Sequence, residues 1–387
     1  MTQKLQWLEV MRGVAACWVL VYHANQSVTN FIGPSGEPHV LISNGYLGVD
    51  FFFVLSGFII AYSSNRLLET GRGLVDYARA RIVRVYVPYL PIGTTMFMLY
   101  LVWPHLSAAD RSPGLLTSLT LLPSNSPPAL SVAWTLVHEI IFYALFSLFF
   151  LWRHALWSLL ALWAISIGCY VWLGQPLARG LEYLLSPLNL CFLLGVAVYY
   201  LTRKGVAARV AIAAAVVGAV VVVFEASQQQ PSRWLLALGF SALIVGASSA
   251  TARCWNPRRW MMTLGAASYS IYLSHGPVLS IAVRGFRRIL PDAGSLAALL
   301  VISVFSLAVG LVYCFIYERR ALVVVREFFT ATTLMAAMEL VSSALRRVET
   351  KNVSLNGTIR PQSRANALLQ SIRVNSRLLI QRQKCLG

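Results

Sequence analysis

The stretch LEVMRGVAACWVLVYHANQ, residues 8–26, is apolar enough to lie in a membrane, yet it holds Arg12 near one end and His23 near the other. The two residues are eleven positions apart, which in an α-helix brings both side chains to one face, about 16 Å apart along the axis. Ionisable side chains inside a membrane helix are costly and usually face a partner or a pathway. The alternative is that Arg12 only reaches the headgroup region and His23 is a hydrogen-bonded interfacial residue. The stretch therefore predicts a membrane helix with a polar stripe.

The composition of the whole chain agrees with this interpretation. Of the 387 residues, 57% are hydrophobic and 12% are charged, and the mean hydropathy is +0.65. An ordinary soluble domain does not need that much apolar surface. We therefore expect an all-α, polytopic integral membrane protein, with about ten transmembrane helices around a polar cavity. The predicted spans lie near 8–28, 45–63, 82–103, 130–151, 155–173, 182–201, 207–224, 233–250, 262–283 and 295–318.

The distribution of charge argues against a nucleic-acid partner, although the formal net charge is +18. Lys and Arg gather in alternate connections, for example at 66–84, 203–209 and 253–259, whereas 29–44 has none. This is the positive-inside pattern, and it predicts a membrane protein with both termini in the cytoplasm. The six cysteines have neither disulfide nor metal-ligand spacing, and we expect no metal site.

One predicted outer connection departs from that pattern, because it carries Arg284, Arg287 and Arg288. Two interpretations stay open for this basic cluster. It belongs to an amphipathic segment at the membrane surface, or it forms a basic rim that faces an anionic acceptor or a lipid phosphate.

The composition changes after Arg326, where Asn, Gln, Ser and Arg become frequent. We expect a transmembrane domain over 1–326 and a basic cytoplasmic tail over 327–387. The tail lacks apolar runs long enough for a core and is expected to be largely disordered. Its segment 331–347 has the periodicity of an amphipathic helix, and the basic tail suits contact with anionic membrane lipids.

Other predicted helices bring polar residues to the same two depths as Arg12 and His23. Asp50, Glu139 and His275 are expected near the level of His23 in the outer half of the membrane. Arg81 and Arg84 enter the third predicted helix from the cytoplasm, at the level of Arg12. The sequence thus predicts an inner arginine layer and an outer layer of histidines and carboxylates.

These two layers suit the chemistry of acyl transfer from acyl-CoA. Arginine binds phosphate through paired hydrogen bonds, and histidine, with a pKa of about 6.5, can act as a general base at neutral pH. The separation of the layers is comparable to an extended pantetheine arm. A proton-coupled transporter could use the same histidines and carboxylates as a proton relay, so this alternative stays open at this point.

Five motifs in order resemble those of the membrane-bound acyltransferase 3 family, which includes bacterial O-acetyltransferases of polysaccharide and lipopolysaccharide. The resemblance covers about residues 5–318. It rests on Arg12-x10-His23, GYLGVDFFFVLSGF (45–58), RIVR (81–84), WTLVHE (134–139) and SYSIYLSH (268–275). It implies transfer of an acyl group, usually acetyl, from cytoplasmic acetyl-CoA or another acyl-CoA to a hydroxyl of an extracytoplasmic or lipid-linked carbohydrate. A small-molecule acceptor such as a macrolide is the other acceptor that the resemblance allows.

The resemblance also implies roles for individual residues. His23 is expected to be the catalytic base, with Glu139 and His275 in the catalytic site and Arg12, Arg81 and Arg84 binding the acyl-CoA. We expect Glu139 or Asp50 to orient His23.

His275 or Tyr272 is expected to stabilise the oxyanion, and Trp134 and Tyr272 to contact substrate. His138 and Ser56 are interpreted as structural. An acyl-imidazole on His23 is an alternative route. Polysaccharide assembly proteins are candidate partners.

Overall fold

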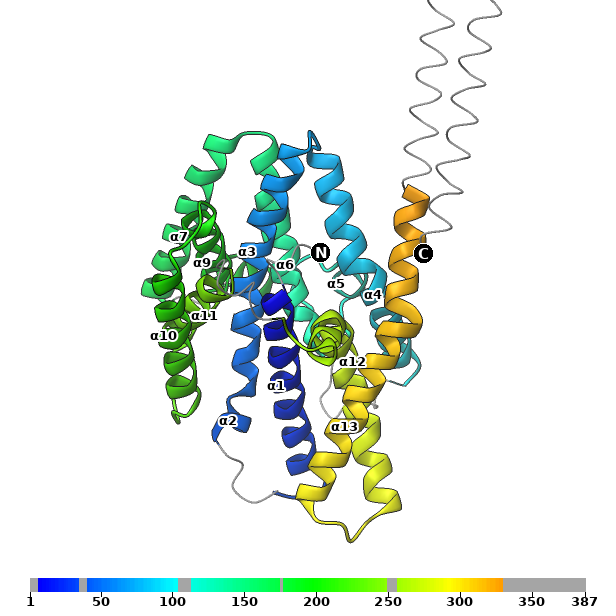
Figure 1. Cartoon of the computed structure of the whole chain (residues 1–387). Helices are drawn as coiled ribbons and strands as arrows, with labels where there is room; N and C mark the ends of the chain where they lie inside the picture. The colour runs from blue at the N-terminus through cyan, green and yellow to red at the C-terminus, as the bar shows by residue number, and fades with distance from the viewer. Residues whose placement is uncertain (1–5, 35–39, 104–112, 175–176, 249–255, 330–387) are drawn as a thin grey trace, which may run out of the picture. The chain divides into compact units, whose positions relative to one another are not determined.

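The computed structural model describes residues 6–34, 40–103, 113–174, 177–248 and 256–329. Within these ranges the chain is built of helices without a strand, which confirms the all-α prediction (Figure 1). The α-helices are α1 (Gln6–Phe31), α2 (Val40–Ser43), α3 (Gly48–Glu69), α4 (Leu74–Val102), α5 (Leu115–Thr120), α6 (Trp134–Phe146), α7 (Arg153–Leu173), α8 (Arg179–Leu185), α9 (Asn189–Thr202), α10 (Ala208–Ala226), α11 (Arg233–Ser248), α12 (Arg259–Ile289) and α13 (Ser295–Tyr313). Short 3₁₀ turns flank α6 and precede α3, and a π-helical turn, Cys314–Glu318, follows α13.

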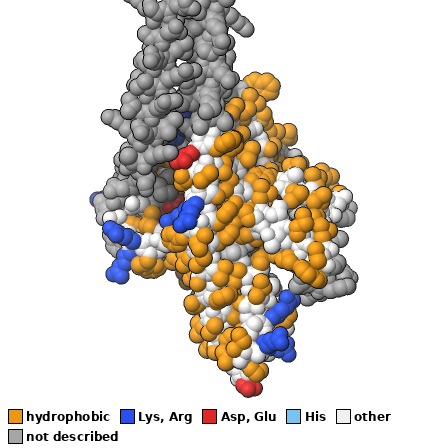
Figure 2. Space-filling model, turned by 90° about the vertical axis from the view of Figure 1, so that its right-hand side faces the viewer, with side chains coloured by type: hydrophobic (Ala, Val, Ile, Leu, Met, Phe, Trp, Pro, Cys, Tyr) orange, Lys and Arg blue, Asp and Glu red, His pale blue; other side chains and the backbone are white. Residues whose placement is uncertain are grey.

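Seven helical segments of the described chain are long and apolar enough to cross a membrane. They are Gly45–Glu69, Leu74–Val102, Ser131–Phe150, His154–Leu173, Gly180–Thr202, Ala208–Ala226 and Ser295–Phe329. Large apolar side chains such as Leu201 (78% exposed) and Ile281 (70%) lie on the surface, and hydrophobic side chains are spread over the described part of the face in Figure 2. A lipid environment accounts for such exposure, and the chain is a membrane protein.

The other three predicted spans correspond to α1, α11 and α12. α11 has 16 residues and is short for a full crossing. α1 and α12 contain charged and polar residues, which lower their hydropathy. The structure thus identifies seven spanning segments by length and composition among the described residues, and the three others stay predictions.

Glycines allow two pairs of helices to meet backbone to backbone. A Cβ on Gly265 of α12 would lie 2.0 Å from the carbonyl oxygen of Glu9 on α1, and one on Gly13 would lie 2.9 Å from the Gly265 nitrogen. α3 and α9 meet in the same way, because a Cβ on Gly57 or Gly195 would overlap the facing backbone. Small residues commonly permit such close approach between membrane helices. These contacts hold α1 against α12 and α3 against α9.

The chain divides into two units, Met1–Leu322 and Val323–Gly387. The first unit contains α1 to α13. The predicted tail helix at 331–347 and most of the predicted tail 327–387 lie outside the described residues. The predicted boundary at residue 326 stays a prediction.

Candidate functional site

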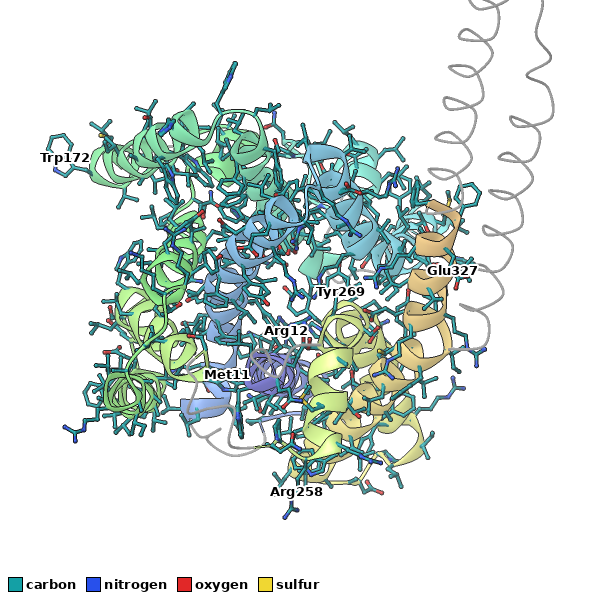
Figure 3. The ribbon with its side chains drawn as sticks, turned by 45° about the horizontal axis from the view of Figure 1, so that its top comes forward. Met11, Arg12, Trp172, Arg258, Tyr269 and Glu327 are labelled. Carbon is teal, nitrogen blue, oxygen red and sulfur yellow. The ribbon has the colours of Figure 1, made fainter. Side chains whose placement is uncertain are left out.

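A cavity of about 300 Å³ lies among α1, α3, α4, α6 and α12. All three arginines of the predicted inner layer, Arg12, Arg81 and Arg84, line it. In Figure 3, Arg12 of α1 and Tyr269 of α12 lie toward the middle of the helices, whereas Trp172 projects outward from α7. The structure therefore brings together guanidinium groups from two helices that the sequence placed at one depth.

The three arginines differ in the hydrogen bonds and ion pairs that their guanidinium groups make within the protein. Arg12 forms an ion pair with Glu9 one helical turn earlier, with 3.0 Å between Nη1 and Oε2. Arg81 donates to Ser63 and its buried Nε has no hydrogen-bond partner among the described residues. Arg84 makes no hydrogen bond or ion pair with any described residue, although it lines the cavity. Unused guanidinium donors in a cavity suit a ligand that carries phosphate oxygens.

Tyrosine hydroxyls from α12, α13 and the turn after α13 donate hydrogen bonds to α4 near its prolines. Pro91 has no N–H to donate to the carbonyl of Val87, and a proline inside a helix leaves such a carbonyl unpaired. Three tyrosine hydroxyls donate to carbonyls in this part of α4: Tyr269 to Val85 (3.1 Å), Tyr313 to Pro88 (2.8 Å) and Tyr317 to Val87 (3.1 Å). These hydrogen bonds hold α4, and with it Arg81 and Arg84, against α12 and α13.

Glu139 lies with the arginines. It lines the cavity and accepts hydrogen bonds from Ser56 (3.1 Å) and from Tyr143. Among the described residues no hydrogen bond joins it to His23 or His275. Glu139 therefore does not orient His23 through a hydrogen bond, and its role in catalysis stays a prediction.

His23 and His275 meet across the α1–α12 interface, with 5.0 Å between ring centroids. The Nδ1 of His23 is 3.0 Å from the carbonyl oxygen of Val19, one turn earlier. A carbonyl can only accept, so Nδ1 carries the proton and Nε2 is left as the acceptor. His275 is 1% exposed, and neither of its ring nitrogens makes a hydrogen bond of good geometry to a described residue. A backbone carbonyl, not a carboxylate, thus orients His23.

A series of aromatic rings joins the arginine cavity to this histidine pair. Phe52 and Tyr272 line the cavity. Successive ring centroids are 5.9 Å apart for Phe52–Tyr272, 5.6 Å for Tyr272–His275, 5.0 Å for His275–His23 and 4.9 Å for His23–Tyr22. The hydroxyl of Tyr272 is engaged with Thr135 (3.0 Å) and the carbonyl of Val132 (3.3 Å). The ring of Tyr272 therefore separates the cavity from the buried imidazole of His275.

Asp50 pairs with an arginine and not with His23. Its two carboxylate oxygens accept hydrogen bonds from Arg233 at the start of α11, at 2.6 and 3.0 Å. The carboxylate is fully buried, and no histidine is among its partners in the described chain. The expectation that Asp50 orients His23 is therefore not supported.

Two other aromatic residues of α6 pack inside the bundle. Trp134 contacts Phe53 and His138, with centroids 6.3 and 5.7 Å away, and it does not line the cavity. His138 is buried and hydrogen-bonded to Asn189 (3.0 Å), in agreement with a structural role. Contact of Trp134 with substrate stays a prediction.

Several cavity residues were missed by sequence reasoning. Glu9 lies three positions before Arg12, and Tyr143 lies four positions after Glu139, so helical spacing could have identified both. Ser63 and Tyr269 come from other helices, and only the tertiary structure shows them. The described residues contain no group of three or more His, Cys, Asp or Glu side chains that could hold a metal ion.

Comparison with known proteins identifies the family. A family model described as an acyltransferase domain matches residues 5–317. The chain belongs to the acyltransferase 3 family. This acyltransferase is similar to the exopolysaccharide production protein ExoZ of Rhizobium meliloti (strain 1021), with 30% identity over 261 residues, 62% of this chain and 78% of ExoZ. It is also 32% identical over 161 residues to protein 2 in the picA locus of Rhizobium radiobacter, covering 36% of this chain and 79% of that protein. No solved structure matches the acyltransferase.

Proposed function

We propose that this acyltransferase moves an acetyl group from acetyl-CoA to a hydroxyl of a carbohydrate, with an extracytoplasmic exopolysaccharide or lipid-linked sugar as acceptor. The observation that carries the proposal is the contact series from the arginine cavity through Tyr272 to His275 and His23. A phosphate-binding region and a general base are thereby joined inside one helix bundle. Exopolysaccharide production by the similar protein ExoZ supports a carbohydrate acceptor.

The donor is assigned to the arginine side of the site. Arg84 and the free Nε of Arg81 suit the phosphates of coenzyme A, and Arg12, which is paired with Glu9, lies in the same cavity. The axial distance between Arg12 and His23 is about 16 Å, which an extended pantetheine arm can bridge. The thioester then arrives beside the histidines while the nucleotide stays among the arginines.

His23 acts as the general base in this proposal. Its Nε2 takes the proton of the acceptor hydroxyl while the hydroxyl oxygen attacks the thioester carbonyl carbon. His275 donates a hydrogen bond to the oxyanion that forms, because the hydroxyl of Tyr272 is already engaged by Thr135 and Val132. The carbon–sulfur bond then breaks, and the proton on His23 passes to the thiolate. The products are an ester and the free thiol of coenzyme A.

Membrane orientation follows from the same assignment. The protein lies in the inner membrane of a bacterium in this proposal. Acetyl-CoA is a cytoplasmic metabolite, so the arginines and the N-terminus face the cytoplasm. Membrane lipids and polysaccharide assembly proteins are the partners that this location makes available. Cysteine variants at exposed helix ends, labelled with a membrane-impermeant maleimide, test the orientation.

A vesicle assay tests the function. Purified protein is reconstituted in vesicles with radiolabelled acetyl-CoA and a glycan, and alkali-labile label on the glycan is measured. We expect label with the unmodified protein and none with His23→Ala, while the matched control His154→Ala, an exposed histidine of α7, retains activity. Equal ester formation by His23→Ala would exclude His23 as the base. If the active protein labels a macrolide but no glycan, the acceptor is a small molecule and not a carbohydrate polymer.

An acyl-imidazole on His23 is the alternative chemical route. Mass spectrometry of protein incubated with acetyl-CoA alone distinguishes the two routes. Direct transfer predicts unmodified His23 under these conditions, whereas the covalent route predicts an acetyl adduct on its ring.

A further inference from the structure

A second polar and aromatic cluster lies next to His23, beyond the arginine cavity. It consists of Tyr22 and Gln26 on α1, Tyr46 in the turn before α3, and Arg233 at the start of α11. None of the four lines the arginine cavity. Gln26 and Arg233 are exposed, and Tyr22 and Tyr46 are partly exposed. We refer to these four residues as the outer cluster.

The aromatic part of the outer cluster touches the proposed base. The ring of Tyr22 stands at 81° to that of His23, with 4.9 Å between centroids. The ring of Tyr46 follows 5.4 Å from that of Tyr22. Gln26 donates to the hydroxyl of Tyr22 at 2.6 Å, which fixes the orientation of that ring. Two tyrosine rings thus extend from the imidazole to the exposed part of the bundle.

The polar part of the outer cluster is held by buried groups. Nε and Nη2 of Arg233 donate to Asp50, which is completely buried, while the Arg233 side chain itself is 46% exposed. Nη1 of Arg233 has no partner among the described residues. The amide of Asn44, which is also buried, donates to the carbonyls of Ala226 (3.0 Å) at the end of α10 and Gln228 (2.8 Å) in the loop before α11. These contacts fix the position of Arg233 at the start of α11.

The chemistry of the outer cluster suits a neutral sugar. The C–H bonds of a sugar ring carry partial positive charge and pack on the negative face of an aromatic ring. Asp50 neutralises Arg233 as a pair, so the guanidinium offers directed donors without a net positive charge. Such donors recognise hydroxyl groups, whereas a carboxylate or phosphate would favour an unpaired cation.

We propose that the outer cluster is an acceptor subsite, which binds an uncharged sugar unit and presents a hydroxyl to Nε2 of His23. This inference rests on the proposed function, since it assigns a place to the acceptor of the same reaction. The arginine cavity and the outer cluster then lie on either side of the histidine pair, so donor and acceptor reach His23 from different directions. Asp50 acts as a positioning residue through Arg233.

The experiment compares KM values for the acceptor and the donor. Tyr46→Leu keeps apolar bulk but removes the aromatic face, and we expect the KM for a neutral glycan to rise roughly threefold to tenfold. The KM for acetyl-CoA should stay the same. Tyr46→Phe, which keeps the ring, should recover most of the loss. The control Trp172→Leu makes the same kind of change at an aromatic side chain that is 86% exposed on α7, and it should change neither value.

The outcomes separate this inference from the proposed function. If the unmodified protein labels no glycan, the proposed function fails. If it labels a glycan and Tyr46→Leu leaves the acceptor KM unchanged, only the acceptor subsite is overturned. Should Tyr46→Leu not accumulate, competition on the unmodified protein decides between a neutral glycan and one of the same sugars carrying a carboxylate. Preference for the neutral glycan supports the subsite, and preference for the charged one overturns it.

Discussion

The imidazole rings of His23 on α1 and His275 on α12 lie 5.0 Å apart, yet the protein treats them differently. Val19 accepts a hydrogen bond from Nδ1 of His23, whereas the nitrogens of His275 have no well-aligned partner among the described residues. One histidine is therefore held in a single tautomer, whereas the other is buried without a well-aligned hydrogen bond to a described residue. This asymmetry supports the proposal that His23 is the base and that His275 stabilises the oxyanion.

Replacing His275 tests that separation. His275→Phe keeps a ring of similar size but removes both nitrogens, and we expect kcat to fall roughly 10²–10³-fold with the KM for acetyl-CoA unchanged. Tyr272→Phe should lower kcat far less, because Thr135 and Val132 already occupy that hydroxyl. Steady-state kinetics in vesicles provide both values. A larger loss in Tyr272→Phe than in His275→Phe would reverse the assignment.

Removing the guanidinium of Arg84 should weaken donor binding. Arg84→Gln removes a charged donor that makes no hydrogen bond or close ion pair with a described residue, so we expect the KM for acetyl-CoA to rise about tenfold to a hundredfold. The protein should accumulate normally, because no ion pair is broken. The matched control is Arg72→Gln, at an exposed arginine before α4. An unchanged donor KM in Arg84→Gln would remove Arg84 from the donor site.

A methyl group at the α1–α12 contact should destabilise the bundle. In Gly265→Ala the new Cβ would lie 2.0 Å from the carbonyl oxygen of Glu9, and relief of this overlap should cost about 1–3 kcal/mol. Gly285→Ala on the same helix meets no atom within 4 Å and is the control. Thermal unfolding in detergent should show a lower Tm for Gly265→Ala alone. Equal Tm values would mean that α1 and α12 can move apart without a loss of thermal stability.

The Asp50–Arg233 pair predicts a rescue experiment. Arg233→Ala leaves the buried carboxylate of Asp50 without its partner, which should lower the free energy of unfolding by about 3 kcal/mol. The double variant Asp50→Ala/Arg233→Ala removes the stranded charge and should recover part of this loss. Thermal unfolding of the two variants gives the comparison. Additive losses in the double variant would contradict a direct interaction between the two side chains.

Helical periodicity was sufficient to predict the arginine cavity. Arg12 lies on a helix with a polar stripe, and Arg81 and Arg84 are one turn apart on another helix. The sequence therefore predicts both the depth of these arginines in the membrane and the helix face on which they lie. The histidine pair followed from similar reasoning, since His23 and His275 each lie beyond the middle of a long, regular helix.

The carboxylates could not be placed in the same way. α6 is flanked by 3₁₀ turns at Ser131–Ala133 and Ser147–Phe150, and such turns change both the rise and the angle per residue. Ser56, which donates a hydrogen bond to Glu139, comes from α3, so helical spacing alone does not identify it as a partner. Asp50 stands in the first turn of α3, and its partner comes from the start of α11, far along the sequence. No local pattern predicts that contact.

The backbone contact between Gly13 and Gly265 has a consequence for biosynthesis. α1 leaves the ribosome early, and it lacks the hydropathy of the seven spanning segments, whereas the helix that receives it is made much later. We therefore expect α1 to be held stably in the membrane only once α12 has been inserted. Truncation before α12 should leave the first helix open to extraction from the membrane by carbonate.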